Sequence, residues 1–133
     1  LGVYGIARDL SAAGIGKLKV PDFKKIKGSF KSPIKVSLNF DENSADACPI
    51  FVGRYFRGVR NGESPQWLKT RLSSIGLRPI SALVDITNYS TIALNRPLHV
   101  FDADKIKGNL KVRKSFAGEE FHSLDNKSYK LEG

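Results

Sequence analysis

The chain of 133 residues is 41% hydrophobic and carries 22 Lys and Arg against 13 Asp and Glu, a formal net charge of +9. This composition supports one modest folded domain and argues against wholesale disorder, while the positive charge suits either a polyanionic partner or plain solubility. No apolar run approaches the roughly 20 residues that span a bilayer, and no signal-peptide pattern is present, so we expect a cytoplasmic protein without a membrane partner.

The N-terminal region predicts a helix followed by a basic linker. Apolar residues recur at helical spacing over residues 1–13, and Gly14 follows as a helix stop. Residues 17–35 then hold seven Lys and a single acid, Asp22, with Pro and Gly interrupting any periodicity. Such a run predicts a linker or surface segment, and two interpretations of its charge remain open: a solvated surface or contact with RNA.

The middle of the chain predicts two strands and a turn. Apolar and polar residues alternate over residues 34–40, which is typical of a half-buried strand. Residues 50–59 predict a second strand, and Asn61 with Gly62 predicts the turn that ends it. Between the strands lies Cys48, which we expect to be a buried structural thiol because a lone cysteine cannot form an internal disulfide.

Two helices are predicted next. Ser64 and Pro65 suit the start of the first, since Ser caps free N–H groups and Pro fits the first turn, and Gly76 ends it. The second is predicted from Pro79 to about Leu94. The residues expected on the buried sides are Leu68, Leu72 and Ile75 in the first helix and Ile80, Leu83 and Val84 in the second.

The C-terminal region predicts short strands. Residues 110–114 predict one strand, and residues 121–124 and 128–131 predict a hairpin around Asp125 and Asn126. The alternation of strands and helices predicts an α+β fold, a mixed β-sheet with packed helices and the helix of residues 1–13 on one side.

Several polar residues stand in the apolar region that follows Gly76: Arg78, Asp85, Thr87, Asn88 and His99. No nucleophile elbow or phosphate-binding loop accompanies them. One Cys and two His also exclude the multi-ligand Cys/His zinc signatures, so we expect no metal site. Local chemistry alone leaves the role of the histidine open between a structural and a catalytic one.

The strings GLRP, VDITNY and RPLHVFDADKI follow one another within residues 76–106. Together with CPIFVGRYFRGVRNGESPQWLKTRL before them and VRKSFAGEEFHSLDNKSYKL after them, they closely resemble the B3/B4 module of the phenylalanyl-tRNA synthetase β subunit family. The opening GVYGIARDLSAAG resembles the helix that closes the preceding B1 unit. The resemblance implies a B1 helix in residues 1–16, a Lys-rich linker in 17–33 and the first part of the B3/B4 editing module in 34–133.

In this family the module hydrolyses tyrosine wrongly attached to the phenylalanine tRNA, because a phenylalanine pocket rejects the extra hydroxyl of tyrosine only modestly. The resemblance therefore implies part of a phenylalanine–tRNA ligase, with tRNA(Phe), the α subunit and the rest of the β subunit as partners. ATP and Mg²⁺ would serve other domains, so no cofactor is expected in this chain. The alternative is a non-catalytic module that packs against the subunit and contacts tRNA.

The resemblance also implies site residues. His99 matches the histidine of the PLH motif and would orient the attacking water or a terminal ribose hydroxyl. Asn88 and Thr87 match the TN pair and would bind the aminoacyl group or the developing oxyanion. Arg78 matches the arginine of GLRP and would hold the terminal phosphate or pack the site together. We expect His99 and Asn88 to act in catalysis and Thr87 and Arg78 in substrate binding, without a single general base.

Other residues are expected to be structural. We interpret Asp85 and Asp102 as capping or hydrogen-bonding groups, and His122 has no counterpart in the family's site. The family completes its pocket with a downstream glycine-rich segment of the GVMGG type and a carboxylate that reads the tyrosine hydroxyl. The chain lacks Met and stops at Gly133 before that segment. We therefore expect an excised piece of a longer protein whose pocket is incomplete and which is inactive alone.

Overall fold

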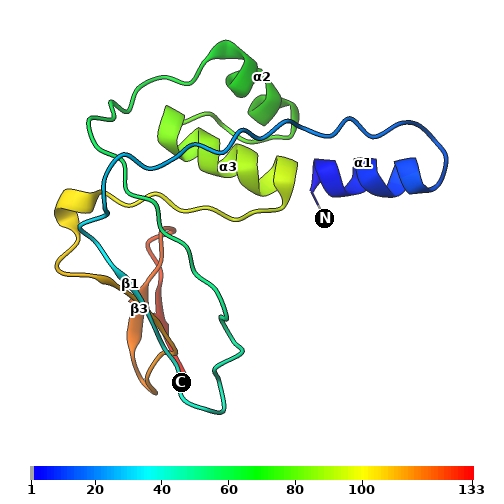
Figure 1. Ribbon diagram of the computed structural model, residues 1–133. Helices are drawn as coiled ribbons and strands as arrows, with labels where there is room; N and C mark the ends of the chain where they lie inside the picture. Colours follow the sequence, from blue (N-terminus) through cyan, green and yellow to red (C-terminus); the bar gives the residue numbers. More distant parts are fainter. Residues whose placement is uncertain (1) are drawn as a thin grey trace. The chain divides into compact units, whose positions relative to one another are not determined.

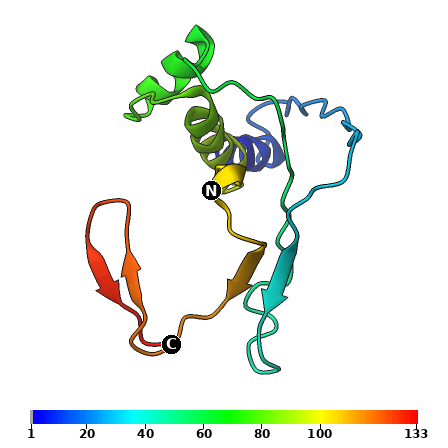
Figure 2. The ribbon, with the colours of Figure 1, turned by 90° about the vertical axis from the view of Figure 1, so that its left-hand side faces the viewer.

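The computed structural model describes residues 2–133, which divide into two compact units. The first unit contains residues 2–29 and Arg57–Asp102, and the second contains Phe30–Phe56 and Ala103–Gly133. The helices belong to the first unit and the paired strands to the second, as Figures 1 and 2 show. The predicted α+β class is therefore confirmed.

Helix α1 spans Val3–Ala12 and packs against helix α3, which spans Ala82–Leu94 (Figure 1). The helix predicted over residues 1–13 is thus confirmed over Val3–Ala12, with Gly2 and Ala13 as its caps, and residue 1 lies outside the described residues. Gly2 makes the close approach of the two helices feasible, because a Cβ there would lie 2.7 Å from the backbone nitrogen of Asn95. Only glycine fits this contact without a shift.

Helix α2 spans Gln66–Ser74 and supplies the core of the first unit. Leu68 and Leu72 are each 1% exposed, and they are the buried hydrophobic side chains of residues 2–133. Ile75, predicted beside them, is 47% exposed because it follows the last helical turn as the C-cap. Gly76 then leaves the helix with φ +80°. The predicted buried side of α2 is therefore confirmed at Leu68 and Leu72 and wrong at Ile75.

Helix α3 begins at Ala82 and not at Pro79, so the predicted start is wrong by three residues. Ser81 is extended, with φ −161° and ψ 157°, and the N–H of Ile80 donates to a side chain instead of joining the helix. Ile80 is accordingly 71% exposed and lies outside the buried side. At the other end Asn95 takes left-handed angles, φ 53° and ψ 41°, which close the helix.

The second unit contains two separate two-stranded sheets in place of the single mixed sheet that was predicted (Figure 2). Strand β1, Val36–Asn39, pairs in parallel with β2, Leu110–Arg113. Strand β3, Glu120–His122, pairs antiparallel with β4, Ser128–Lys130. The predicted hairpin is confirmed, and its turn contains Asn126 with φ 62°. A short 3-10 helix, Ala103–Lys105, precedes β2.

Residues 50–59 form no strand, so this prediction is wrong. Ile50 and Val52 are 77% and 82% exposed, and Gly58 has φ +68°, which a strand does not accommodate. The sequence pattern of a strand cannot form a sheet without a neighbouring backbone to accept and donate hydrogen bonds. Cys48 is half-buried, with its thiol 3.7 Å from the Ile50 carbonyl, so the prediction of a buried thiol is also wrong.

Candidate functional site

Helix α3 carries two of the four candidate residues, Thr87 and Asn88, and the buried carboxylate of Asp85 holds its N-terminal turn in place. Asp85 is 0% exposed and accepts hydrogen bonds from the Ser64 hydroxyl at 2.5 Å and the Ile80 N–H at 2.9 Å. Burial by itself raises the pKa of Asp85, but the bonds from Ser64 and the backbone outweigh it, so the pKa lies below the ordinary value. The carboxylate is ionised and structural, as the sequence indicated.

Asn61 and Gly62, about 20 residues earlier in the sequence, form hydrogen bonds with the first residues of α3. The Asn61 side-chain oxygen accepts the N–H of Leu83 at 3.2 Å, and its amide nitrogen donates to the Ser81 hydroxyl at 3.2 Å. The Gly62 carbonyl accepts the N–H of Ala82 at 2.8 Å. Helix N-termini leave free N–H groups that need such partners. Residues 61 and 62 form no turn, so that prediction is wrong; they instead support the start of the helix that carries Thr87 and Asn88.

Thr87 and Asn88 lie next to each other in the middle of α3 and are both half-buried. The Thr87 hydroxyl donates to the Val84 carbonyl at 2.7 Å, so its proton is committed within the helix. The Asn88 amide forms no hydrogen bond with any residue that the structure describes, which leaves its donors and its acceptor for a ligand. Adjacent helix positions diverge by about 100°, so the two side chains do not face one point.

Arg78 and His99 lie in the segments that lead into and out of α3, and both are exposed. The His99 ring lies 4.4 Å from the Phe101 ring, centroid to centroid, at an interplanar angle of 57°. Within residues 2–133 no hydrogen bond or ion pair joins any two of Arg78, Thr87, Asn88 and His99. The four groups are thus carried by one helix and its two flanks without contacting each other.

A cluster that the sequence analysis missed ties α2 to α3 beside Asn88. The Arg71 guanidinium donates to the Tyr89 hydroxyl at 2.8 Å and lies over the rings of Trp67 and Tyr89, 5.5 Å and 5.8 Å from their centroids. The two rings meet edge to face at 5.5 Å. The spacing of Trp67 and Arg71, four residues apart on a predicted helix, was a signal for their contact. Nothing in the sequence pattern predicted that Tyr89 contacts Trp67 and Arg71.

A cavity of about 490 Å³ lies between α1, the segment that follows it and the end of α3. Its lining includes Val3, Leu10, Leu18, Tyr89 and Leu94, and none of the four candidate residues. Among the described residues no group of three or more His, Cys, Asp and Glu could hold a metal ion. None of the described helices is long and apolar enough to cross a membrane.

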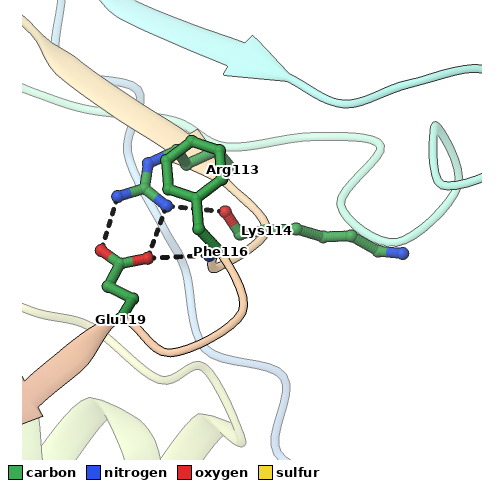
Figure 3. A network of polar contacts seen from close by, with 4 residues as sticks. All are labelled: Arg113, Lys114, Phe116 and Glu119. Carbon is green, nitrogen blue, oxygen red and sulfur yellow. Dashed lines mark hydrogen bonds and ion pairs between the residues drawn. The ribbon is translucent and has the colours of Figure 1, made fainter. Parts of the chain in front are cut away.

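In the second unit, a polar network fixes the connection between β2 and β3 (Figure 3). Arg113 donates to both carboxylate oxygens of Glu119, at 2.6 Å and 2.9 Å, and to the Lys114 carbonyl at 2.8 Å. Glu119 also accepts the N–H of Phe116, whose ring lies 4.4 Å from the guanidinium. The bond from Arg113, followed by the one from the Phe116 backbone, lowers the pKa of Glu119 to about 2. These groups are occupied with each other, which indicates a structural role.

His122 is also part of this unit. Its Nδ1 lies 2.7 Å from the Ser128 hydroxyl, across the hairpin from strand β3 to β4. This contact gives the ring a local partner. His122 and His99 are the two histidines of the chain, and they differ in that His99 forms no hydrogen bond with the described residues.

Residues 47–133 match the model of the B3/4 domain family. The chain is 60% identical over 129 residues to the phenylalanine–tRNA ligase beta subunit of Ruegeria pomeroyi, covering 97% of this chain and 16% of that protein. It is 57% identical to the phenylalanine–tRNA ligase beta subunit of Paramagnetospirillum magneticum, with 99% and 16% covered. The corresponding subunit of Cereibacter sphaeroides is 56% identical, with 98% and 16% covered. The chain therefore spans about a sixth of the length of these curated relatives.

Proposed function

This chain belongs to the B3/4 domain family, and from that premise we propose that it forms part of the editing module of a phenylalanine–tRNA ligase β subunit. The module removes tyrosine from mischarged tRNA(Phe) by hydrolysis of the aminoacyl ester. The observation that carries the proposal is the family match, whose span of residues 47–133 contains all four candidate residues. The relatives named above are β subunits, and each aligns with nearly the whole of this chain.

The chemistry of the candidate residues suits ester hydrolysis by positioning. Asn88 brings neutral hydrogen-bonding groups that are not used inside the protein, and such groups stabilise a developing oxyanion without adding a charge. His99 is exposed, and its imidazole nitrogens can donate and accept hydrogen bonds, which suits a group that orients water. No nucleophile with an adjacent base occurs among the four, so water is the attacking group.

Thr87 and Arg78 have supporting roles in this proposal. The Thr87 hydroxyl donates to the helix, but its oxygen still accepts a hydrogen bond from the aminoacyl group or the terminal ribose. Arg78 is exposed and offers a fixed fork of donors to a phosphate of the tRNA end. The four groups would contact different parts of the substrate, since they do not contact one another in the protein.

The proposal extends to the whole protein. The parent is a ligase of the cytoplasm that joins phenylalanine to tRNA(Phe), and its partners are the α subunit and the rest of the β subunit. ATP and Mg²⁺ serve the synthetic reaction outside this chain.

The test is deacylation of tyrosyl-tRNA(Phe) by the assembled ligase. We expect His99→Ala and Asn88→Ala to lower the rate constant at saturating RNA by about 10²-fold or more, the usual effect of removing one positioned group. His122→Ala is the matched control, since it removes the other histidine of the chain. Unchanged deacylation in His99→Ala and Asn88→Ala, with aminoacylation intact, would contradict the proposed site.

A second candidate function is a non-catalytic module that contacts tRNA. The separation of the four candidate side chains and the exposed Lys residues of the linker favour it. It predicts that His99→Ala and Asn88→Ala leave deacylation unchanged while tRNA binding still weakens with rising salt. The two functions are therefore separated by the same set of variants.

A further inference from the structure

The segment that follows α1, residues 17–27 and here called the lysine strap, concentrates charge that folding does not use. It contains five Lys and one acid, Asp22, within eleven residues. All five Lys residues are exposed, and none forms an ion pair within residues 2–133. Like charges so close together repel each other, which costs the free protein stability unless an anion neutralises them.

The strap has no helix or strand of its own and is attached to the first unit near its start. The N–H of Leu18 donates to the Ser11 hydroxyl of α1 at 3.2 Å. Lys17, Leu18 and Lys19 contribute to the lining of the cavity beside α1. An extended chain rises by about 3.3 Å per residue, so the eleven residues of the strap can span at most about 36 Å.

Aromatic and aliphatic side chains alternate with these charges. Phe23 is 69% exposed and lies between Asp22 and Lys24, while Val20 and Ile26 are 73% and 76% exposed. Cationic groups interleaved with an exposed ring suit single-stranded nucleic acid, whose phosphates bind the cations and whose bases stack on the ring. A membrane surface is less suited to the strap, because an interfacial segment needs a helix with one continuous apolar face.

We propose that the lysine strap binds the phosphate backbone of tRNA and that Phe23 stacks on an unpaired base of the same RNA. This inference rests on the proposed function for the identity of the RNA, and it assigns the contact to a segment outside the B3/4 match that contains none of the four candidate residues. The strap would hold the RNA while the residues on and around α3 act on its aminoacyl end.

The charge part is tested by the variant Lys24→Gln, Lys25→Gln, Lys27→Gln in the assembled ligase, with a tRNA(Phe) transcript as the probe. Each lost contact with a single-stranded phosphate changes the slope of log K against log salt by about 0.7, so three change it by about 2. At 0.1 M salt this corresponds to binding about 100-fold weaker. The control is Lys107→Gln, Lys111→Gln, Lys130→Gln, which removes the same charge from exposed positions of the second unit.

The expected result is a change in slope with the strap variant and none with the control. Equal changes in both triple variants, or no change in either, would overturn the proposal. Lys24→Arg, Lys25→Arg, Lys27→Arg should bind as the wild type does, which separates loss of charge from damage to the fold. Vesicles of phosphatidylglycerol and phosphatidylcholine give the second arm: loss of vesicle binding with RNA binding unchanged would also overturn it.

The stacking part is tested by Phe23→Leu and Phe23→Tyr. Leu keeps apolar area but lacks a ring, so we expect binding about fivefold weaker or more with the salt slope unchanged, whereas Tyr should bind as Phe does. Equal binding by the Leu variant would overturn this part. Deacylation at saturating RNA should not change in any strap variant, so failure of the strap and failure of the proposed site give different results.

Discussion

Removal of the Asp85 carboxylate is the sharpest test of how the chain holds α3 in place. Asp85 accepts one hydrogen bond from the buried Ser64 hydroxyl and one from the Ile80 backbone. Hydrogen bonds to charged groups contribute about 1.5–3 kcal/mol each, and a buried donor left without a partner costs about 1–3 kcal/mol. Asp85→Ala removes both bonds, so we expect it to destabilise the first unit by about 3–5 kcal/mol.

Asp85→Asn separates the charge from the shape of the side chain. Its amide oxygen still accepts one hydrogen bond, but its NH₂ group faces a donor, so we expect a loss of about 1.5–3 kcal/mol. Urea unfolding followed by the fluorescence of Trp67 measures both variants, because Trp67 is the single tryptophan of the chain and lies in α2. Ser64→Ala, which removes one of the two donors, should fall between the wild type and Asp85→Ala.

The dependence on pH gives an independent check with a definite sign. The folded-state pKa of Asp85 is lowered, so its contribution to stability is present above the unfolded-state value and is lost as the pH falls through the folded-state pKa. The difference between wild type and Asp85→Asn should therefore be full at pH 7 and shrink in acid. An Asp85→Asn variant as stable as the wild type at pH 7 would refute the anchoring role of the carboxylate.

Two further predictions concern the other polar clusters. Glu119→Gln should lower the melting temperature at pH 7 but not near pH 2. The reason is that the pKa of Glu119 is lowered to about 2, so the contribution of its carboxylate to stability disappears as the pH falls through that value. A difference in melting temperature between variant and wild type that is the same at both pH values would contradict the pairing with Arg113. Arg71→Ala should destabilise the first unit by about 1 kcal/mol and shift the emission of Trp67, since it removes the bond to Tyr89 and a cation from the indole ring. Emission and stability equal to those of the wild type would count against this cluster.

Local patterns predicted those elements that are stabilised by neighbours close in sequence. Helix α2 was predicted from Leu68 and Leu72, which are spaced one helical turn apart. The hairpin was predicted from alternating residues on either side of a turn at Asn126, whose left-handed backbone the turn requires. Residues 50–59 have the composition of a strand but no strand partner among the described residues. The residue types favour extended structure and so predicted a strand, but no neighbouring strand pairs with this segment among the described residues.

The prediction of where α3 begins failed for a related reason. Pro79 is a good first helical residue, but Asp85 takes the N–H of Ile80, and Asn61 takes the N–H of Leu83 from 22 residues away. These partners are placed by tertiary structure, and no window of sequence around Pro79 contains them all. The dipeptide Asn61-Gly62 predicted a turn, but the structure has no turn there, and both residues form hydrogen bonds with the start of the helix instead.

The candidate site was found by resemblance, and the structure now distinguishes the two members of its TN pair. The Thr87 hydroxyl donates to Val84, as threonine does in many helices, so a structural account of Thr87 is complete without a ligand. Asn88 is half-buried and forms no hydrogen bond with the described residues, and its amide atoms remain accessible to water. No contact within the protein therefore uses the Asn88 amide, and it is free to bind a substrate. Asn88→Ala should for this reason impair deacylation more than Thr87→Val, at little cost in stability, because the alanine variant breaks no hydrogen bond of the free protein.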